Sequence, residues 1–244
     1  MALLEIEHVT KRFGGLVATN DVTFSIREGE IGFIVGPNGA GKTTLFNLIS
    51  GVLHPDSGTI RFQGRDISRI APNQAAEAGI GRTFQVVKPL RKLTVRENVM
   101  LGAFLRTSST AKAAEEARSV LKYLQMEKTA DLHASGLPLP MLKRLEIARA
   151  LATKPRLILL DEVMSGLNTS EALALAETLK KLPEWGIAAV GGVEHVMQVV
   201  MSIAHRVVVL DHGTLIAEGT PQEVVRQPQV IEAYLGSKYK ELGL

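Results

Sequence analysis

The sequence contains no cysteine, few aromatic residues and no long uninterrupted hydrophobic run. Without cysteine the chain has no disulfide bonds, thiolate metal ligands or cysteine nucleophile. A membrane-spanning helix needs about 18 consecutive apolar residues, and no segment reaches that length. The first residues also lack the basic and then apolar order of a secretory signal. We therefore expect a soluble cytoplasmic protein, or one held at a membrane only by a partner.

The chain also has little net charge, because neither sign of charge predominates. Lys and Arg total 28 and Asp and Glu total 25, so the formal net charge is +3. Domains that bind nucleic acid usually carry a concentrated basic surface, so this balance argues against nucleic acid as a partner. The chain has 244 residues, of which 45% are hydrophobic. That length can bury a sizeable core in one large domain, or in one domain with a substantial insertion.

The first third of the chain has the pattern of β-strands. Residues 3–9 and 21–26 alternate apolar and polar positions, as half-buried strands do. Residues 31–35 are almost wholly apolar, which is typical of a strand buried on both faces of a sheet. A helix is expected over residues 42–50 and should end at Gly51.

The middle of the chain, about residues 94–128, is rich in helix-forming residues and begins with a capping box of Thr94 and Glu97. The last third alternates strands and helices again, and Thr220 opens a second capping box. Helices are expected at about 141–153 and 170–182, and strands at 157–160, 187–193, 206–210 and 214–218. This order predicts an α/β core interrupted by a helical insertion.

A glycine-rich loop separates the apolar strand at 31–35 from the helix that follows it. The loop matches G-x-x-x-x-G-K-[ST], in which backbone amides and the positive end of the helix surround phosphate groups. Lys42 can reach the β and γ phosphates of a nucleoside triphosphate, and the Thr43 hydroxyl can bind Mg²⁺. The expected ATP-binding residues here are Gly36, Pro37, Asn38, Gly39, Ala40, Gly41, Lys42, Thr43 and Thr44.

Two acidic residues, Asp161 and Glu162, follow a second apolar strand. Open α/β sheets bind ligands at the carboxyl ends of their strands. Because neighbouring residues on a strand point to opposite sides, the two acids should have different roles. We assign Asp161 to the metal and Glu162 to the attacking water, as its general base.

The whole helical insertion separates Lys42 from Asp161. This arrangement resembles the ATP-binding cassette (ABC) ATPases, in which a helical subdomain interrupts a RecA-like mixed sheet that carries an antiparallel β subdomain. The resemblance implies ATP hydrolysis with ATP and Mg²⁺. It divides the chain into residues 1–86 and 155–235 for the two parts of the core, 87–154 for the helical subdomain, and 236–244 for a tail.

The resemblance implies roles for three more residues. Phe13 matches the aromatic residue that stacks on adenine, Gln85 matches the glutamine that senses the γ-phosphate and Mg²⁺, and His195 matches the switch histidine that holds the γ-phosphate. Without the family pattern, they would be an ordinary core residue, a solvated loop residue and a structural histidine. Gly191 and Gly192 should weaken the strand that leads to His195.

The sequence departs from the family at its signature, Leu-Ser-x-Gly-Gln. In relatives, the Ser hydroxyl, the Gly amide and the start of the next helix bind the γ-phosphate held by the opposite subunit. Pro138 has no hydroxyl and neither proline has an N–H, so phosphate donors are lost, although Pro140 is compatible with a helix start. The corresponding residues here are Leu137, Pro138, Leu139, Pro140 and Met141.

A second departure lies in the D-loop, which ends in Asn168 where the family usually has Asp. ABC ATPases close as dimers, with each nucleotide between the phosphate loop of one subunit and the signature of the other. This chain would supply an intact loop and a poor signature, so we favour a heterodimer with a second ABC ATPase over a homodimer with two impaired sites. The D-loop residues are Ser165, Gly166, Leu167 and Asn168.

Several stretches look most like the ATP-binding subunits of branched-chain (hydrophobic) amino acid importers. Such importers contain two different ATPases, two integral membrane permease subunits and an external solute-binding protein. The resemblance implies a place on the cytoplasmic face of the membrane, bound through the permeases. Urea importers, lipopolysaccharide exporters, soluble ABC ATPases and a binding-only regulatory subunit stay open as alternatives. The similar stretches are 11–18, 79–85, 144–149, 216–221 and 230–235.

The segment after Gln85 should lie beside a cytoplasmic helix of a permease if the family layout holds. It comprises residues 86–90 and the basic pair Arg91 and Lys92. A solvated basic face is the alternative interpretation of this cluster.

Overall fold

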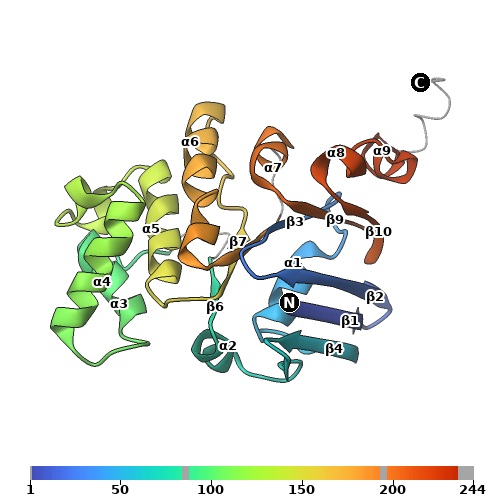
Figure 1. The fold of residues 1–244 in the computed structure, drawn as a ribbon, viewed down its shortest axis with the longest axis horizontal. Helices are drawn as coiled ribbons and strands as arrows, with labels where there is room; N and C mark the ends of the chain where they lie inside the picture. Colours follow the sequence, from blue (N-terminus) through green and yellow to red (C-terminus); the bar gives the residue numbers. More distant parts are fainter. Residues whose placement is uncertain (1, 84–87, 193–196, 236–244) are drawn as a thin grey trace.

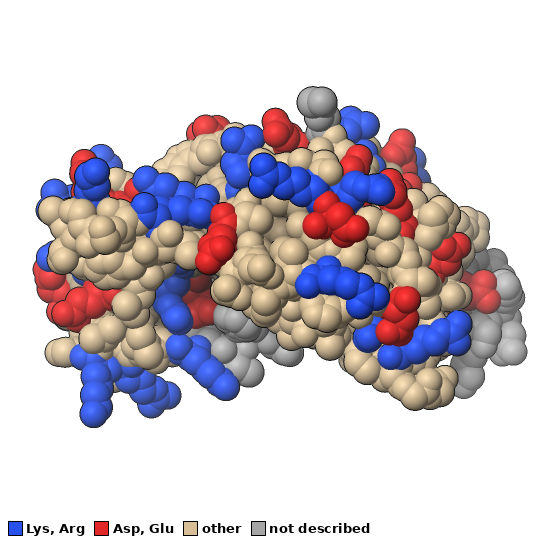
Figure 2. Space-filling model, turned by 90° about the horizontal axis from the view of Figure 1, so that it is seen from below, with Lys and Arg blue, Asp and Glu red and all other residues tan. Residues whose placement is uncertain are grey.

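The computed structural model describes residues 2–83, 88–192 and 197–235, which form two β-sheets and a group of helices at one end (Figure 1). Gln85, His195 and the tail at 236–244 lie outside the described residues. In the described part of the chain, no helix is long and apolar enough to cross a membrane. Basic and acidic side chains are interspersed on the face seen from below in Figure 2.

The smaller sheet is antiparallel, with strand order β2-β1-β4-β5. Its buried residues Leu4 and Phe62 belong to the same hydrophobic cluster as Leu45 and Phe46 of helix α1. The small sheet therefore packs on the helix that follows the glycine-rich loop. The elements involved are β1 (Ala2–Phe13), β2 (Leu16–Arg27), β4 (Ser57–Phe62), β5 (Arg65–Asp66) and α1 (Lys42–Ile49).

The larger sheet has the strand order β10-β9-β3-β8-β7-β6, and all its neighbours are parallel except the β9–β10 pair. Every residue of β3 and β7 is buried, as their apolar sequences predict. Parallel strands end at the same edge, so the glycine-rich loop after β3 and the acidic pair after β7 share that edge. The strands are β3 (Ile31–Val35), β6 (Ile80–Arg82), β7 (Leu157–Asp161), β8 (Ala188–Gly192), β9 (Arg206–Asp211) and β10 (Thr214–Gly219).

The two faces of the larger sheet belong to different cores. Ile158 and Leu160 of β7 share a cluster with Leu175 of α6, whereas Leu157 and Leu159 share the other cluster with α1. This period of two is the alternation that a strand imposes on its side chains. The remaining helices of the core are α2 (Pro72–Ala78), α6 (Thr169–Leu179), α7 (Met197–Ile203), α8 (Pro221–Val224) and α9 (Pro228–Leu235).

Three helices form the inserted group at the other end of the molecule (Figure 1). The capping box at Thr94 is confirmed, because its Oγ1 accepts a hydrogen bond from the Glu97 amide at 3.2 Å and Glu97 accepts one from the Thr94 amide at 2.7 Å. The last residue of α4, Tyr123, donates to the Thr178 carbonyl of α6 at 2.6 Å and packs on Trp185, with 4.3 Å between ring centres. The helices are α3 (Val95–Ala103), α4 (Thr110–Tyr123) and α5 (Leu139–Leu151).

The structure adds detail to two of the expectations. Helix α5 begins at Leu139, two residues earlier than expected, because prolines are compatible with the N-cap and the first turn. β8 continues through both glycines and pairs with both β3 and β7 as far as Gly192. A Cβ at Gly191 would lie 2.4 Å from the Phe33 ring, so the glycine makes room for that side chain.

Candidate nucleotide-binding site

The glycine-rich loop joins the end of β3 to the start of α1. Gly41 sits at the N-cap of α1 with φ 100°, a conformation that side chains with a Cβ rarely adopt. A Cβ there would also lie 2.2 Å from the Ala18 carbonyl oxygen of β2. The backbone of the loop is therefore pressed against a neighbouring strand in a way that only glycine allows.

Lys42 lies almost completely buried within this loop. Its Nζ donates hydrogen bonds to the carbonyl oxygens of Gly36 at 2.7 Å and Pro37 at 2.6 Å. Burial lowers the pKa of the Lys42 ammonium, and the nearby Glu162 carboxylate partly offsets this effect. The first turn of α1 contains no acidic residue, so the positive end of the helix and Lys42 together favour an anion.

A cavity of about 490 Å³ brings the loop together with residues from distant parts of the chain. Phe13, at the end of β1, lines it with a side chain that is 46% exposed, which excludes the alternative of an ordinary core phenylalanine. Glu162 lines the same cavity from the end of β7. Of the expected ATP-binding residues, Phe13, Asn38, Gly39, Ala40, Gly41, Lys42, Thr43 and Thr44 line this cavity.

The two acidic residues after β7 have different surroundings, as their adjacency predicts. Glu162 adopts a φ of 49°, and its carbonyl oxygen accepts a hydrogen bond from Lys143 of α5 at 2.9 Å. Asp161 is buried, and its Oδ2 pairs with Arg82 at 3.1 Å. Burial raises the pKa of the Asp161 carboxyl, while the hydrogen bond and charge of Arg82 oppose the rise. The carboxylate that the sequence assigns to a metal is therefore held by a cation from β6.

Thr43 and Asp161 are oxygen ligands of the kind that Mg²⁺ prefers. Among the described residues, no group of three or more His, Cys, Asp or Glu side chains is arranged to hold a metal ion. A single hydroxyl and a single carboxylate suit an ion that keeps several waters and also binds the phosphates of its nucleotide. The residues present therefore fit Mg²⁺ carried with a nucleoside triphosphate, and they do not form an all-protein metal cage.

The residues expected to form a degenerate signature, 137–141, lie at the start of α5. Pro138 is the N-cap, Leu139 is the first helical residue and Pro140 is the second, so two of these three positions have no backbone N–H. The Met141 amide donates to the Pro138 carbonyl at 3.0 Å. This helix start is well formed but offers few backbone donors to a phosphate. The side chain of Leu139 is 43% exposed and faces Gly166 of the D-loop segment.

Asn168, the last D-loop residue, has a structural role that the sequence interpretation missed. It is the N-cap of α6: its side chain accepts from the Glu171 amide at 3.0 Å, and Glu171 accepts from the Asn168 amide at 3.0 Å. The spacing Asn-x-x-Glu is a capping-box signal that the sequence already contains. Arg82 and Lys143 were also missed, because both reach the acidic pair from distant parts of the chain.

Comparisons with known proteins identify the family of the chain. The ABC transporter family model matches residues 19–165, and the model for branched-chain amino acid ATP-binding cassette transporters matches residues 214–240. The high-affinity branched-chain amino acid transport ATP-binding proteins LivG of Salmonella typhimurium and BraF of Pseudomonas aeruginosa are 38% and 37% identical to this chain. Each alignment covers 96% of this chain and 98% of the relative.

Solved structures show the same fold. A crystal structure of the ADP conformation of an ABC transporter cassette superposes with a TM-score of 0.88 at 32% identity, covering 97% of this chain and 100% of that one. A dimeric post-hydrolysis state of a cassette bound to ADP and phosphate has a TM-score of 0.80 at 27% identity, covering 89% and 98%. The α/β core with an antiparallel β subdomain and a helical insertion is thereby confirmed. The chain is an ABC-type ATPase and belongs to the branched-chain amino acid transport family of ABC transporter ATP-binding proteins.

Proposed function

We propose that this chain is the ATP-hydrolysing subunit of an importer for branched-chain or other hydrophobic amino acids. The observation that carries the hydrolytic part is that the glycine-rich loop, Phe13 and Glu162 line one and the same cavity. The solute class is supported by the relatives, whose names specify branched-chain amino acid transport. Closure of an ATPase dimer around ATP would drive the transport step.

The proposal gives roles to residues of the cavity and to Asp161, which lies next to Glu162 in the chain. Phe13 stacks on adenine, and the loop amides with Lys42 hold the phosphates. Thr43 and Asp161 would hold Mg²⁺, which neutralises charge on the phosphate oxygens when it is bound. Glu162 accepts the proton of the water that attacks the γ-phosphate. From the family pattern, we add Gln85 and His195 as contacts to the γ-phosphate.

The partner ATPase in this proposal is a different chain. The loop and acidic residues of this chain complete one ATP site with the signature of the partner. The start of α5 has lost two N–H groups and the signature hydroxyl, so it supports the second site poorly. A homodimer would contain two such impaired sites. We therefore propose an asymmetric dimer bound to two permease subunits and, through them, to an external solute-binding protein.

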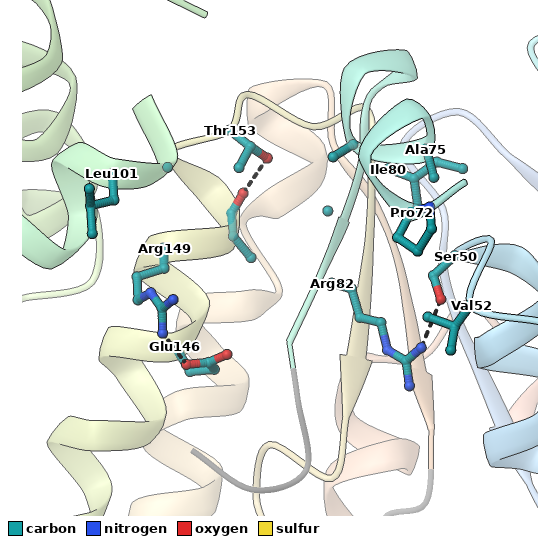
Figure 3. A pocket seen from close by; sticks show the side chains of 14 residues that line it. Ser50, Val52, Pro72, Ala75, Ile80, Arg82, Leu101, Glu146, Arg149 and Thr153 are labelled. Atoms are coloured by element: carbon teal, nitrogen blue, oxygen red, sulfur yellow. Dashed lines mark hydrogen bonds and ion pairs between the residues drawn. The ribbon is translucent and has the colours of Figure 1, made fainter. Parts of the chain in front are cut away.

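A groove between the core and the inserted helices offers a surface for a permease. The groove has a volume of about 310 Å³ and is walled by α2, β6 and the end of α1 on one side and by α3 and α5 on the other (Figure 3). Two large hydrophobic residues line it while exposed to solvent, Val52 at 50% and Leu101 at 44%. Arg149, which also lines the groove, donates to the Lys88 carbonyl at 3.2 Å.

This contact places the groove beside the basic segment expected to meet a permease. Leu90 in that segment is 46% exposed, and its backbone is fixed to Asn98 of α3 by hydrogen bonds of 2.9 Å and 3.1 Å. We call the cavity of Figure 3 the docking groove and propose that a cytoplasmic helix of the permease occupies it.

Reconstitution in vesicles tests the whole proposal. This chain, a candidate partner ATPase, the permeases and the binding protein should give ATP-dependent uptake of leucine and no uptake of urea. Lys42→Ala should abolish uptake. Leu90→Asp should reduce uptake while leaving ATP binding unchanged, because it alters only the basic segment beside the docking groove. Uptake of urea would contradict the proposed solute class. Vigorous ATP hydrolysis by the pure homodimer would contradict the asymmetric dimer.

A further inference from the structure

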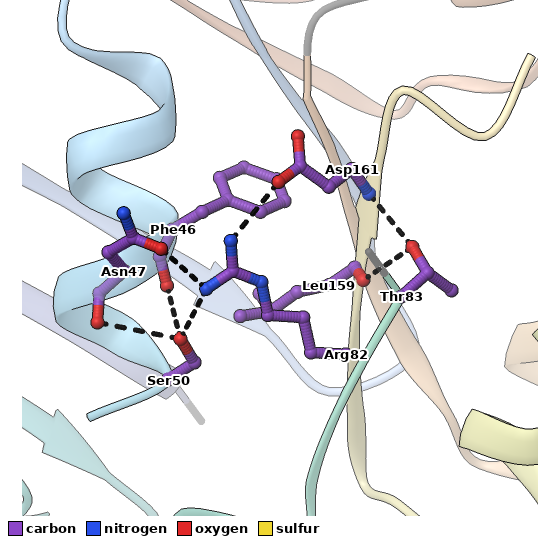
Figure 4. A network of polar contacts seen from close by, with 7 residues as sticks. All are labelled: Phe46, Asn47, Ser50, Arg82, Thr83, Leu159 and Asp161. Atoms are coloured by element: carbon purple, nitrogen blue, oxygen red, sulfur yellow. Dashed lines mark hydrogen bonds and ion pairs between the residues drawn. The ribbon is translucent and has the colours of Figure 1, made fainter. Parts of the chain in front are cut away.

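Arg82, to which no sequence motif assigns a role, connects three elements of the nucleotide site: β6, β7 and α1. It is the last residue of β6, and its side chain is 11% exposed. Its Nη2 lies 3.1 Å from Oδ2 of Asp161, whose side chain is 5% exposed. Its Nη1 lies 2.7 Å from Asn47 Oδ1 and 2.7 Å from Ser50 Oγ (Figure 4).

The partners on α1 place this guanidinium at the carboxyl end of that helix. Ser50 is the C-cap of α1, and its hydroxyl donates to the Phe46 carbonyl at 2.8 Å, so its oxygen accepts from Arg82. A cation is favoured at the negative end of a helix. The opposite end of the same helix carries Lys42 and Thr43. Arg82 therefore links Asp161 to the carboxyl end of α1, and the amino end of the same helix carries the expected phosphate-binding residues.

The pairing also orients the carboxylate. Arg82 contacts Oδ2 of Asp161, and the other oxygen of that carboxylate is turned away from the guanidinium (Figure 4). The backbone amide of Asp161 is fixed by a 3.0 Å hydrogen bond to the Thr83 hydroxyl, next to Arg82 in the sequence. Both the main chain and the side chain of Asp161 are thus held from β6 and the residue after it.

We propose that Arg82 is a positioning residue for ATP hydrolysis, which sets the place of the Asp161 carboxylate relative to Thr43. It acts through Asp161 and does not contact the nucleotide. The fork of the guanidinium is essential, because one planar group reaches Asp161 with one nitrogen and the end of α1 with the other. A lysine has a single ammonium and cannot reproduce the fork.

The test compares ATP affinity with and without Mg²⁺ in the full chain carrying Glu162→Gln, in which hydrolysis is suppressed. Calorimetry gives the dissociation constant in Mg²⁺ and in EDTA, and their ratio measures the gain from the ion. Arg82→Gln should lower this ratio by about fivefold or more, because an unanchored Asp161 holds the ion poorly. Affinity in EDTA should stay within about twofold of the parent, and Arg82→Lys should give an intermediate ratio.

A residue that merely supports the fold would weaken binding equally in Mg²⁺ and in EDTA, and that result would overturn the proposal. An unchanged ratio in Arg82→Gln would do the same. The matched control is Arg149→Gln, which also removes an arginine from the docking groove, but one that pairs with Glu146 at 3.2 Å. Its ratio should equal that of the parent, and a loss as large as that of Arg82→Gln would count against the proposal.

A second variant covers the case in which Arg82→Gln does not fold. The double change Asn47→Ala and Ser50→Ala keeps the pair between Arg82 and Asp161 but removes its attachment to α1. The ratio should fall by about twofold to fivefold in this variant, less than in Arg82→Gln, because the direct pair between Arg82 and Asp161 stays in place. A ratio equal to that of the parent would refute the proposed attachment.

Discussion

The first turns of α1 and α5 differ in what they offer to a phosphate group. α1 begins at Lys42 after Gly41, whose φ and close approach to β2 both require glycine, and its first turn carries an ammonium and hydroxyls. α5 begins after Pro138 and has Pro140 in its first turn. Both helices are well formed. The demands of starting a helix and of binding a phosphate are therefore separate, and a sequence can keep the first while losing the second.

The largest effect is expected from a change in the nucleotide site beside the start of α1. Glu162→Gln should lower the rate of ATP hydrolysis by about 10²- to 10⁴-fold, because the attacking water loses its proton acceptor. Phosphate release by the dimer measures the rate, and calorimetry should find ATP still bound. Glu177→Gln, an exposed position on α6, is the control and should hydrolyse ATP normally. Hydrolysis that survives Glu162→Gln would mean that another group activates the water.

A smaller effect is expected at the amine of the loop. Lys42→Ala should weaken ATP binding by roughly tenfold to 100-fold, since a hydrogen bond to a charged group contributes about 1.5–3 kcal/mol. Calorimetry of the isolated subunit measures this change. Lys112→Ala, on the exposed face of α4, should bind ATP like the parent. Undiminished binding in Lys42→Ala would exclude the loop as the phosphate site.

The next prediction concerns the start of α5, where the family signature can be restored. The triple change Pro138→Ser, Pro140→Gly and Met141→Gln returns donors to the start of α5. Hydrolysis by the homodimer should rise on the order of tenfold, as one regained hydrogen bond to a charged phosphate would produce. In a mixture with a competent partner ATPase, the gain should be smaller, because one site already works there. Equal gains in both dimers would argue against the asymmetric arrangement.

The smallest effect concerns the D-loop and the stability of α6. Asn168→Ala removes the N-cap of α6 and should lower the free energy of unfolding by about 1 kcal/mol. Asn168→Asp keeps an accepting side chain at the cap and should preserve stability. Urea unfolding of the two variants beside the parent measures both values. A stable Asn168→Ala variant would show that the Glu171 contact contributes little.

The sequence predicts those parts of the site that are contiguous in the chain. The loop from Gly36 and the pair Asp161 and Glu162 each combine a pattern with a buried strand, so both their chemistry and their place at the sheet edge follow. The family pattern suggests a role for Phe13, but only its 46% exposure in the structure distinguishes a cavity wall from a core residue. Phe13 is exposed there because tertiary packing brings the end of β1 beside the glycine-rich loop.

Contacts between distant elements are the part that could not be predicted. Arg82 and Asp161 meet because β6 and β7 are neighbours in the sheet, and no local pattern reveals that neighbour relation. Lys143 reaches the Glu162 carbonyl across the boundary between the inserted helices and the core. The ring that fills the space beside Gly191 likewise comes from another strand, β3, and no local pattern reveals it.

The packing of Tyr123 against Trp185 equips the molecule with an intrinsic optical probe. Trp185 is the single tryptophan of the sequence, and its indole is 45% exposed where the end of α4 meets the core. Tryptophan emission from the purified chain therefore originates at one junction. Displacement of α4 would change both the aromatic neighbour and the hydration of that ring. A nucleotide titration followed by fluorescence can thus monitor this junction without any attached dye.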